Sequence, residues 1–195
     1  MIDFKAVMAA LFFALLLLAG LSGSPTAQAE DNTAFWKTLK QGGHVVLLRH
    51  ALAPGTGDPA HFSVDDCTTQ RNLNETGRQQ SRDIGALMRD AGIDSAQVYS
   101  SQWCRCMDTA ELLGLGQVQA LPVLNSFFRN PGRADGQTRA LKDWIRDQSL
   151  AQPVVLVTHQ VNITALTGVY PSSGELVLLD TRGDELQVAG RLETR

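Results

Sequence analysis

The chain has 195 residues, of which 44% are hydrophobic and 19% charged, and its formal net charge is −3. These values are typical of one ordinary globular domain. The slightly negative charge gives no reason to expect nucleic acid as a partner. No internal repeat or low-complexity tract is present beyond the apolar N-terminus.

The N-terminus has the pattern of a secretory signal. Lys5 precedes an apolar run from Ala6 to Leu18, and small residues then lead to Ala27-Gln28-Ala29. This pattern predicts cleavage between Ala29 and Glu30. A retained membrane anchor is the alternative, but no cluster of positive residues follows the run.

The signal peptide would therefore comprise residues 1–29, and residues 30–195 would form a single domain. We expect this domain to be periplasmic or secreted, with no stable membrane anchor after cleavage.

Helix-like and strand-like segments alternate along the domain. The expected strands are the four apolar residues Val45–Leu48, then Val98–Ser100, Val118–Leu124, Pro153–His159, Glu175–Asp180 and Leu186–Leu192. The expected helices are Asp31–Gln41, a helix capped by Asn74 and closed by Gly92, Gln102–Leu113, Gln137–Gln148 and Val161–Val169. Long loops are expected at His50–Leu73 and Phe127–Gly136. The alternation predicts a three-layer α/β/α sandwich with a mainly parallel sheet.

Apolar spacing also predicts which helix faces are buried. The helix Asp31–Gln41, capped by Asn32, is expected to bury Phe35, Trp36 and Leu39. The helix that Asn74 caps is expected to bury Ile84, Leu87, Met88 and Ala91. The helix Gln137–Gln148 is expected to bury Leu141, Trp144 and Ile145.

Two apolar runs end in histidine. His44–Leu48 leads into Arg49-His50, and Val154–Val157 leads into Thr158-His159. Open α/β sheets place their ligands outside the carboxyl ends of the strands. A third strand is followed by a segment that carries Arg105. The sequence therefore predicts cations and imidazoles at one edge of the sheet.

These residues resemble the motifs of the histidine phosphatase superfamily, the phosphoglycerate-mutase-like group. Arg49-His50-Ala51 is similar to its Arg-His-Gly signature. Its Ser-x-x-x-Arg-x-x-x-Thr-Ala element is matched by Ser101, Arg105, Thr109 and Ala110, and its late Thr-His by Thr158-His159. Ala51 and Gln160 are most similar to the phosphohistidine phosphatases and the lipopolysaccharide-core heptose phosphatases.

The resemblance implies a role for each motif residue. His50 would be the nucleophile, Arg49 and Arg105 would bind the phosphoryl oxygens, and His159 would donate a further hydrogen bond. It implies a small phosphorylated substrate and neither a cofactor nor a metal. A zinc site on the two histidines is the rival chemical interpretation, but a third ligand at suitable spacing is missing.

The usual proton donor of the family is missing. The position of its glutamate reads Leu124-Asn125-Ser126, and the position of an aspartate in the other branch is Gln160. Three loop carboxylates are candidate acids: Asp58, Asp65 and Asp66. Taken singly, each is more often a solvated loop residue.

Three cysteines form an odd number in a chain expected to be exported. The alternatives are three buried thiols or one disulfide from Cys67 to either Cys104 or Cys106. His44 and His61 match no motif and are expected at exposed or strand-edge positions.

The sequence thus predicts an exported phosphatase that acts on a phosphomonoester, such as an envelope sugar phosphate, through a phosphohistidine on His50. The alternative is a phosphate-binding module of the same fold with little or no turnover. The sequence does not indicate the oligomeric state.

Overall fold

The computed structural model describes residues 25–194. Its contacts divide the chain into two units, Met1–Asn32 and Thr33–Arg195. Residues 1–24, most of the predicted signal peptide, lie outside the described residues, and the predicted cleavage point after Ala29 falls within the helix Pro25–Lys40. No helix in the described part of the chain is long and apolar enough to cross a membrane.

The second unit is built on one six-stranded sheet with the order β3-β2-β4-β1-β5-β6. Its strands are β1 (His44–Arg49), β2 (Gln97–Ser100), β3 (Val118–Ala120), β4 (Val154–Thr158), β5 (Leu176–Asp180) and β6 (Gln187–Leu192). Strands β3, β2, β4 and β1 run parallel, and β5 runs antiparallel to both of its neighbours, β1 and β6. The mainly parallel sheet is therefore confirmed.

The centre of the sheet is the pair β1 and β4. Both strands are apolar, and their residues Val45–Leu48 and Val154–Val157 are completely buried, as expected for parallel strands covered on both faces. Their register pairs Arg49 with Thr158. The next residue of each strand, His50 or His159, therefore leaves the sheet at the same edge.

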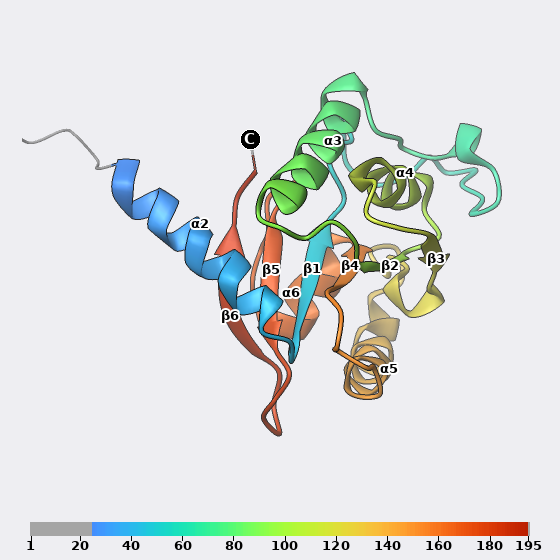
Figure 1. The fold of residues 1–195 in the computed structure, drawn as a ribbon. Helices are drawn as coiled ribbons and strands as arrows, with labels where there is room; N and C mark the ends of the chain where they lie inside the picture. The colour runs from blue at the N-terminus through green and yellow to red at the C-terminus, as the bar shows by residue number, and fades with distance from the viewer. Residues whose placement is uncertain (1–24, 195) are drawn as a thin grey trace, which may run out of the picture. The chain divides into compact units, whose positions relative to one another are not determined.

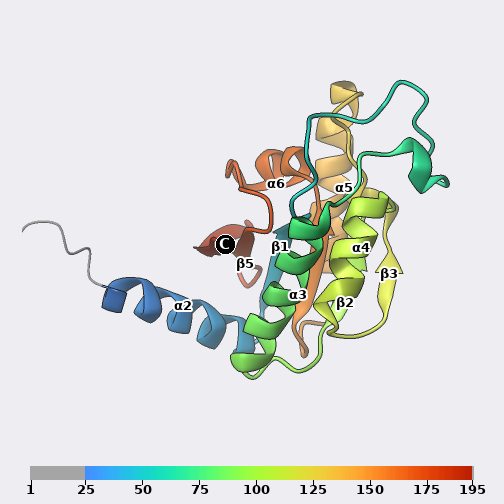
Figure 2. The same ribbon diagram turned by 90° about the horizontal axis from the view of Figure 1, so that it is seen from above.

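Helices cover both faces of the sheet (Figures 1 and 2). They are α3 (Glu75–Asp90), α4 (Cys104–Leu113), α5 (Ala134–Arg146) and α6 (Gln160–Thr167). Of the helix α2 (Pro25–Lys40), residues 33–40 belong to the same unit as the sheet. The core beneath α3 and α4 also receives Phe35, Trp36 and Leu39. The core on the opposite face receives Leu141 and Ile145 of α5 and Ile163 and Leu166 of α6. The three-layer α/β/α sandwich is confirmed.

Several expected boundaries and faces were wrong. The strand expected at Val118–Leu124 ends at Ala120, and a 3-10 turn, Pro122–Leu124, follows because proline cannot donate a ladder hydrogen bond. Asn32 lies within α2 instead of capping it. Leu87 was expected in the core, but its side chain is 44% exposed.

Two other helix starts and one histidine also differ. α4 begins at Cys104 rather than Gln102, and α5 begins at Ala134 rather than Gln137. His44, expected at an exposed or edge position, is buried at the start of a central strand, and its Nδ1 lies 2.6 Å from the carbonyl oxygen of Gly42. His61 is exposed, as expected.

The start of α3 follows directly from the sequence. The side chain of Asn74 accepts a hydrogen bond from the backbone N–H of Gly77 at 2.9 Å, which is the predicted cap. Gly77 itself packs against the loop after β1, and a Cβ there would lie 2.0 Å from the carbonyl oxygen of Leu52. Only glycine fits this contact, so the helix holds the loop close to the strand.

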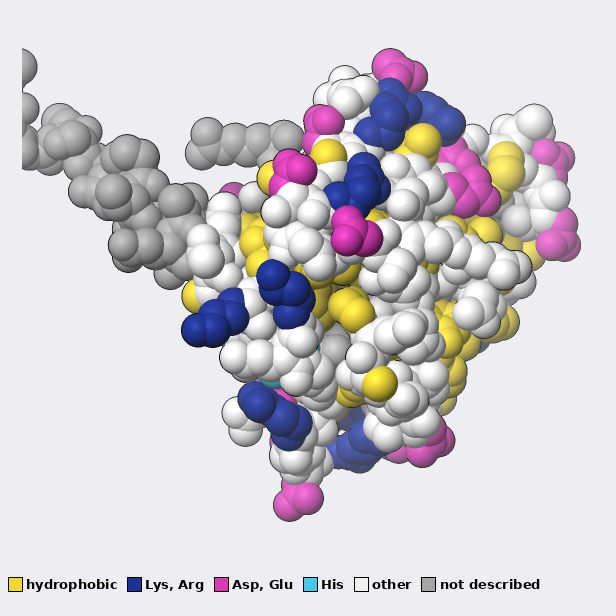
Figure 3. Space-filling view, viewed as in Figure 1, with side chains coloured by type: hydrophobic (Ala, Val, Ile, Leu, Met, Phe, Trp, Pro, Cys, Tyr) yellow, Lys and Arg dark blue, Asp and Glu magenta, His cyan; other side chains and the backbone are white. Residues whose placement is uncertain are grey.

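On the face drawn in Figure 3, acidic and basic side chains are interspersed. That mixed distribution is typical of a soluble surface. It differs from the predominantly cationic lining of the cavity described next.

Candidate active site

The site lies at the carboxyl ends of β1, β2 and β4. The backbone N–H of His50 donates to the carbonyl oxygen of Thr158 at 3.0 Å, and that of Ser101 donates to Val157 at 3.0 Å. These hydrogen bonds fix the three segments that carry the motif residues just beyond the sheet. The predicted residues Arg49, His50, Arg105 and His159 all line one cavity here.

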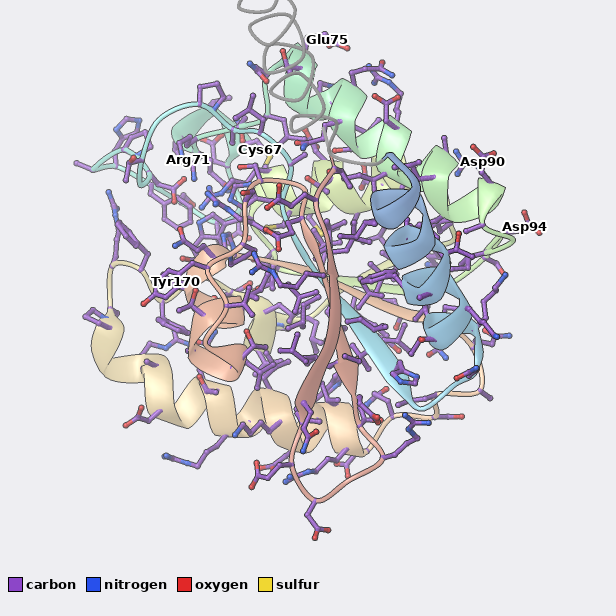
Figure 4. All side chains as sticks on the ribbon, turned by 90° about the vertical axis from the view of Figure 1, so that its left-hand side faces the viewer. Cys67, Arg71, Glu75, Asp90, Asp94 and Tyr170 are labelled. Atoms are coloured by element: carbon purple, nitrogen blue, oxygen red, sulfur yellow. A yellow bond between two sulfur atoms is a disulfide. The ribbon has the colours of Figure 1, made fainter. Side chains whose placement is uncertain are left out.

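This cavity has a volume of about 330 Å³ and is strongly cationic. Five of its lining side chains are arginines: Arg49, Arg71, Arg105, Arg129 and Arg133. The only carboxylate among the described lining residues is Asp58. Figure 4 shows nitrogen-bearing side chains gathered beside Arg71, whereas Asp90 and Asp94 lie toward the opposite side of the view.

His50 is held as a neutral imidazole. It is 2% exposed, and its Nδ1 lies 2.8 Å from the carbonyl oxygen of Ala51. A carbonyl only accepts, so Nδ1 carries the proton and Nε2 keeps its lone pair. Burial and the charge of Arg105 lower the pKa of His50 to about 3. At neutral pH its Nε2 is therefore available as a nucleophile.

The two motif arginines have unused donors. Arg49 Nη1 donates to the carbonyl oxygen of Pro171 at 2.8 Å, and Arg105 Nη1 donates to that of Arg71 at 3.2 Å. The Nε atoms of Arg49 and Arg105 are buried, yet neither bonds to any residue that the structure describes. Buried N–H groups normally have partners, so these donors are suited to an anion in the cavity.

Asp58 binds Arg105 end-on with both carboxylate oxygens, at 2.7 and 3.2 Å. The same oxygens accept from the backbone N–H of Arg71 and from Nε1 of Trp103, each at 3.1 Å. Burial alone would raise the pKa of Asp58, but the hydrogen bonds from Arg105 and Arg71 outweigh it and hold the pKa below its usual value. Asp58 is therefore an ionised anchor for Arg105 in this structure.

His159 is oriented by a chain of polar groups. Its Nε2 lies 2.8 Å from Ser101 Oγ, which in turn donates to Asn125 Oδ1 at 3.2 Å. With the hydroxyl proton directed to Asn125, Nε2 of His159 is the donor to Ser101. Its Nδ1 then accepts from Arg105 Nη2, at 3.4 Å. Burial and the charge of Arg105 lower the pKa of His159 well below its usual value.

A disulfide joins Cys67 to Cys104. This resolves the alternatives left open by the sequence, because Cys106 is free and buried. Burial raises the pKa of Cys106 to about 12, so its thiol is inert. The disulfide ties the loop that carries Asp58 to the residue directly before Arg105.

The other candidate acids and the expected acid positions are also located. Asp65 and Asp66 are exposed and do not line the cavity, and Asp66 caps the 3-10 turn Cys67–Thr69. Ser126 and Gln160 do line it. Within the described residues, no group of three or more His, Cys, Asp or Glu side chains could hold a metal ion.

Sequence reasoning missed three residues of the site. Arg71 and Trp103 contact Asp58, and Asn125 orients Ser101. They lie in loops or at helix starts, where no periodic pattern marks a side chain. Trp103 directly precedes the Cys104–Arg105 pair, which was the one local signal for it.

Comparison with known proteins supports the same picture. The model of the histidine phosphatase superfamily (branch 1) matches residues 45–125. Two mitochondrial serine/threonine-protein phosphatases Pgam5 are similar: that of Drosophila willistoni is 29% identical over 90 residues, and that of Drosophila grimshawi 26% over 91. Each match covers 46% of this chain but only 28% and 29% of the relatives' own lengths.

Solved structures share the fold at lower identity. A candidate phosphohistidine phosphatase, SixA, from Agrobacterium tumefaciens has a TM-score of 0.52 at 22% identity, covering 77% of this chain and 97% of that one. A candidate α-ribazole-5′-P phosphatase from Escherichia coli has a TM-score of 0.58 at 15% identity, covering 77% and 96%. A mycobacterial glucosyl-3-phosphoglycerate phosphatase has a TM-score of 0.55 at 17% identity, covering 75% and 97%.

Proposed function

We propose that this chain is a phosphatase that hydrolyses a phosphomonoester, because the model of the histidine phosphatase superfamily (branch 1) matches its residues 45–125. One observation carries the proposal: the buried Nε donors of Arg49 and Arg105 have no partner among the described residues, and both arginines line the same cavity as a neutral His50. A tetrahedral anion bound to both guanidinium groups would satisfy these donors.

The proposed reaction has two steps. Nε2 of His50 attacks phosphorus, the bond to the leaving oxygen breaks, and a phosphohistidine forms. Water then attacks phosphorus, and the N–P bond breaks with its electron pair returning to Nε2 of His50. Inorganic phosphate leaves with the oxygen and the protons of that water, and the imidazole returns to its neutral form. Arg49 and Arg105 stabilise the phosphoryl oxygens in both steps, which is the main demand of phosphoryl transfer on a protein. His159 adds a hydrogen bond if its Nδ1 gains a proton when the dianion binds.

The proposed substrate has a good leaving group, or its leaving oxygen is protonated from solvent. Among the described residues the cavity has only one carboxylate, and Asp58 already accepts four hydrogen bonds. A positioned acid typically contributes 10²–10⁴-fold to the rate. Without one, phosphomonoesters with a good leaving group, such as aryl and glycosyl phosphates, would be favoured over alkyl esters.

No carboxylate other than Asp58 is among the described lining residues, and this observation favours the second candidate, a phosphate-binding module with little turnover. His50 argues for the enzyme, since binding alone does not need a neutral nucleophile beside the arginines. Steady-state hydrolysis of p-nitrophenyl phosphate by the purified chain separates the two, because that leaving group needs little protonation. Turnover above that of the His50→Ala variant supports the phosphatase, and phosphate binding without turnover supports the module.

We further propose that the protein is periplasmic or secreted, and that an envelope sugar phosphate is among its substrates. The N-terminal signal pattern supports export, and so does the Cys67–Cys104 disulfide, because such bonds persist in oxidising compartments. The substrate rests on resemblance alone. Intact mass of the protein from a secreting host tests the export: it should lack residues 1–29.

A further inference from the structure

We propose that the substrate carries a second anionic group, a carboxylate or a second phosphoryl group, and that Arg129 and Arg133 bind it at the rim of the cavity. This inference rests on the proposed function, because it adds a subsite to the same cavity. It concerns residues that the family motifs do not include.

The charge of the cavity supports the proposal. Five lining guanidinium groups against one lining carboxylate leave an excess of four positive charges. A phosphomonoester dianion supplies only two negative charges. This positive charge also affects the arginines themselves. Burial lowers the pKa values of both Arg49 and Arg71, and the charge of Arg105 lowers them further. A substrate with a second anionic group would relieve this repulsion.

The arginines divide into two sets by position. Arg49 and Arg105 stand beside the two histidines at the ends of the strands, whereas Arg129 and Arg133 are exposed residues of the segment between β3 and α5. In the described part of the chain, Arg129 Nη2 donates to two carbonyl oxygens, those of Asp58 and Pro59, which position the side chain without neutralising its charge. Arg133 makes no side-chain hydrogen bond or ion pair with the residues that the structure describes.

The size of the cavity agrees with a ligand larger than phosphate. Its volume of about 330 Å³ lies in the range of small-molecule pockets. Phe62, which stacks on Trp103 with ring centroids 4.9 Å apart, and the half-exposed Phe128 also line it. These apolar walls suit a compact organic group that joins the two anionic ends.

The test compares two anions by isothermal titration calorimetry on the purified full chain: inorganic phosphate and methylenebisphosphonate, which is not hydrolysed. We expect methylenebisphosphonate to bind about tenfold more tightly, as for one further charge-assisted contact. Arg133→Ala should remove most of this advantage, and Arg133→Lys should keep part of it. Arg139 is an exposed residue of α5 outside the cavity. The Arg139→Ala variant removes the same charge and should keep the full affinity advantage of methylenebisphosphonate.

Equal affinities for the two anions in the unmodified chain would overturn the subsite while leaving the phosphatase proposal intact. An advantage that Arg139→Ala lowers as much as Arg133→Ala would also overturn it, because the effect would then be one of net charge. Failure of both anions to bind would overturn the proposed function together with the subsite.

Discussion

The carboxylate of Asp58 accepts from both Nη atoms of Arg105, whereas the Nε of Arg105 has no hydrogen-bond partner within residues 25–194. The side chains of this pair are 9% and 4% exposed. The guanidinium of Arg105 is planar, and because Asp58 holds both of its Nη atoms it can rotate little. The direction of its Nε–H is therefore fixed. Asp58 thus acts as a positioning residue for Arg105.

This relationship predicts the effect of Asp58→Asn. The variant keeps the shape of the side chain but loses the charge-assisted bonds to Arg105, so kcat/KM should fall about tenfold to a hundredfold on every aryl phosphate. The slope of log rate against leaving-group pKa should stay unchanged, because Asp58 donates no proton. Asp65→Asn, an exposed carboxylate of the same loop, is the control. A steeper slope in Asp58→Asn alone would identify Asp58 as the acid instead.

The phosphoryl-binding role of the two motif arginines can be measured separately. Arg49→Ala and Arg105→Ala should each lower the rate by roughly 10²–10³-fold, as removal of a preorganised transition-state donor does. The Arg49→Lys and Arg105→Lys variants should recover little of the lost rate, because an ammonium group lacks the planar, two-pronged geometry of a guanidinium. Rates within threefold of the unmodified chain would show that neither guanidinium contacts the transferred group.

The two buried histidines should make stability depend on pH. The pKa of His50 is lowered to about 3 and that of His159 lies well below its usual value, whereas in the unfolded chain both are near 6.5. Below about pH 6.5 the unfolded chain therefore binds more protons than the folded one. The free energy of unfolding should be insensitive to these groups above that pH and should fall as the pH drops toward 3.

Urea unfolding at pH 7 and pH 5 measures this effect. The lowered pKa of His50 should reduce the free energy of unfolding by on the order of 1–2 kcal/mol between pH 7 and pH 5. This reduction should be smaller in the His50→Gln variant and unchanged in the His61→Gln variant, which alters an exposed histidine. An identical loss in both variants would mean that His50 is already protonated in the folded protein at pH 5.

The disulfide predicts a specific thiol count. Without reductant, the native chain should show no thiol reactive toward a disulfide reagent, because Cys106 is buried with a raised pKa. After denaturation it should show one thiol, and with reductant three. Replacing Cys67 and Cys104 together by serine should cost on the order of 3 kcal/mol of unfolding free energy. Three thiols in the unreduced, denatured chain would contradict the bond.

The elements with strong local patterns were predictable from the sequence. The apolar runs of β1 and β4 identify central parallel strands, and Asn74 identifies the start of α3. The positions of Arg49, His50 and His159 follow, because each ends or directly succeeds such a strand. The role of His50 came from the family motif rather than from any pattern of apolar residues.

The rest depended on contacts between distant parts of the chain. Asp58 looked like any loop carboxylate, because its partner Arg105 is 47 residues away. The choice between Cys104 and Cys106 depended on which side chain of α4 faces the loop. Leu87 has the helical spacing of a core residue, yet it falls at the edge of the buried stripe.

The most direct test of the account is to trap a phosphoenzyme. The purified chain should be mixed with a ³²P-labelled phosphomonoester, quenched within one turnover, and the protein digested to locate the label. We expect an acid-labile, base-stable phosphoryl group on His50, absent from the His50→Ala variant, which should also lose hydrolysis. Chelators should leave labelling and turnover unchanged, because His50 and the arginines carry the chemistry. Undiminished hydrolysis by His50→Ala, or label on another residue, would contradict the central claim.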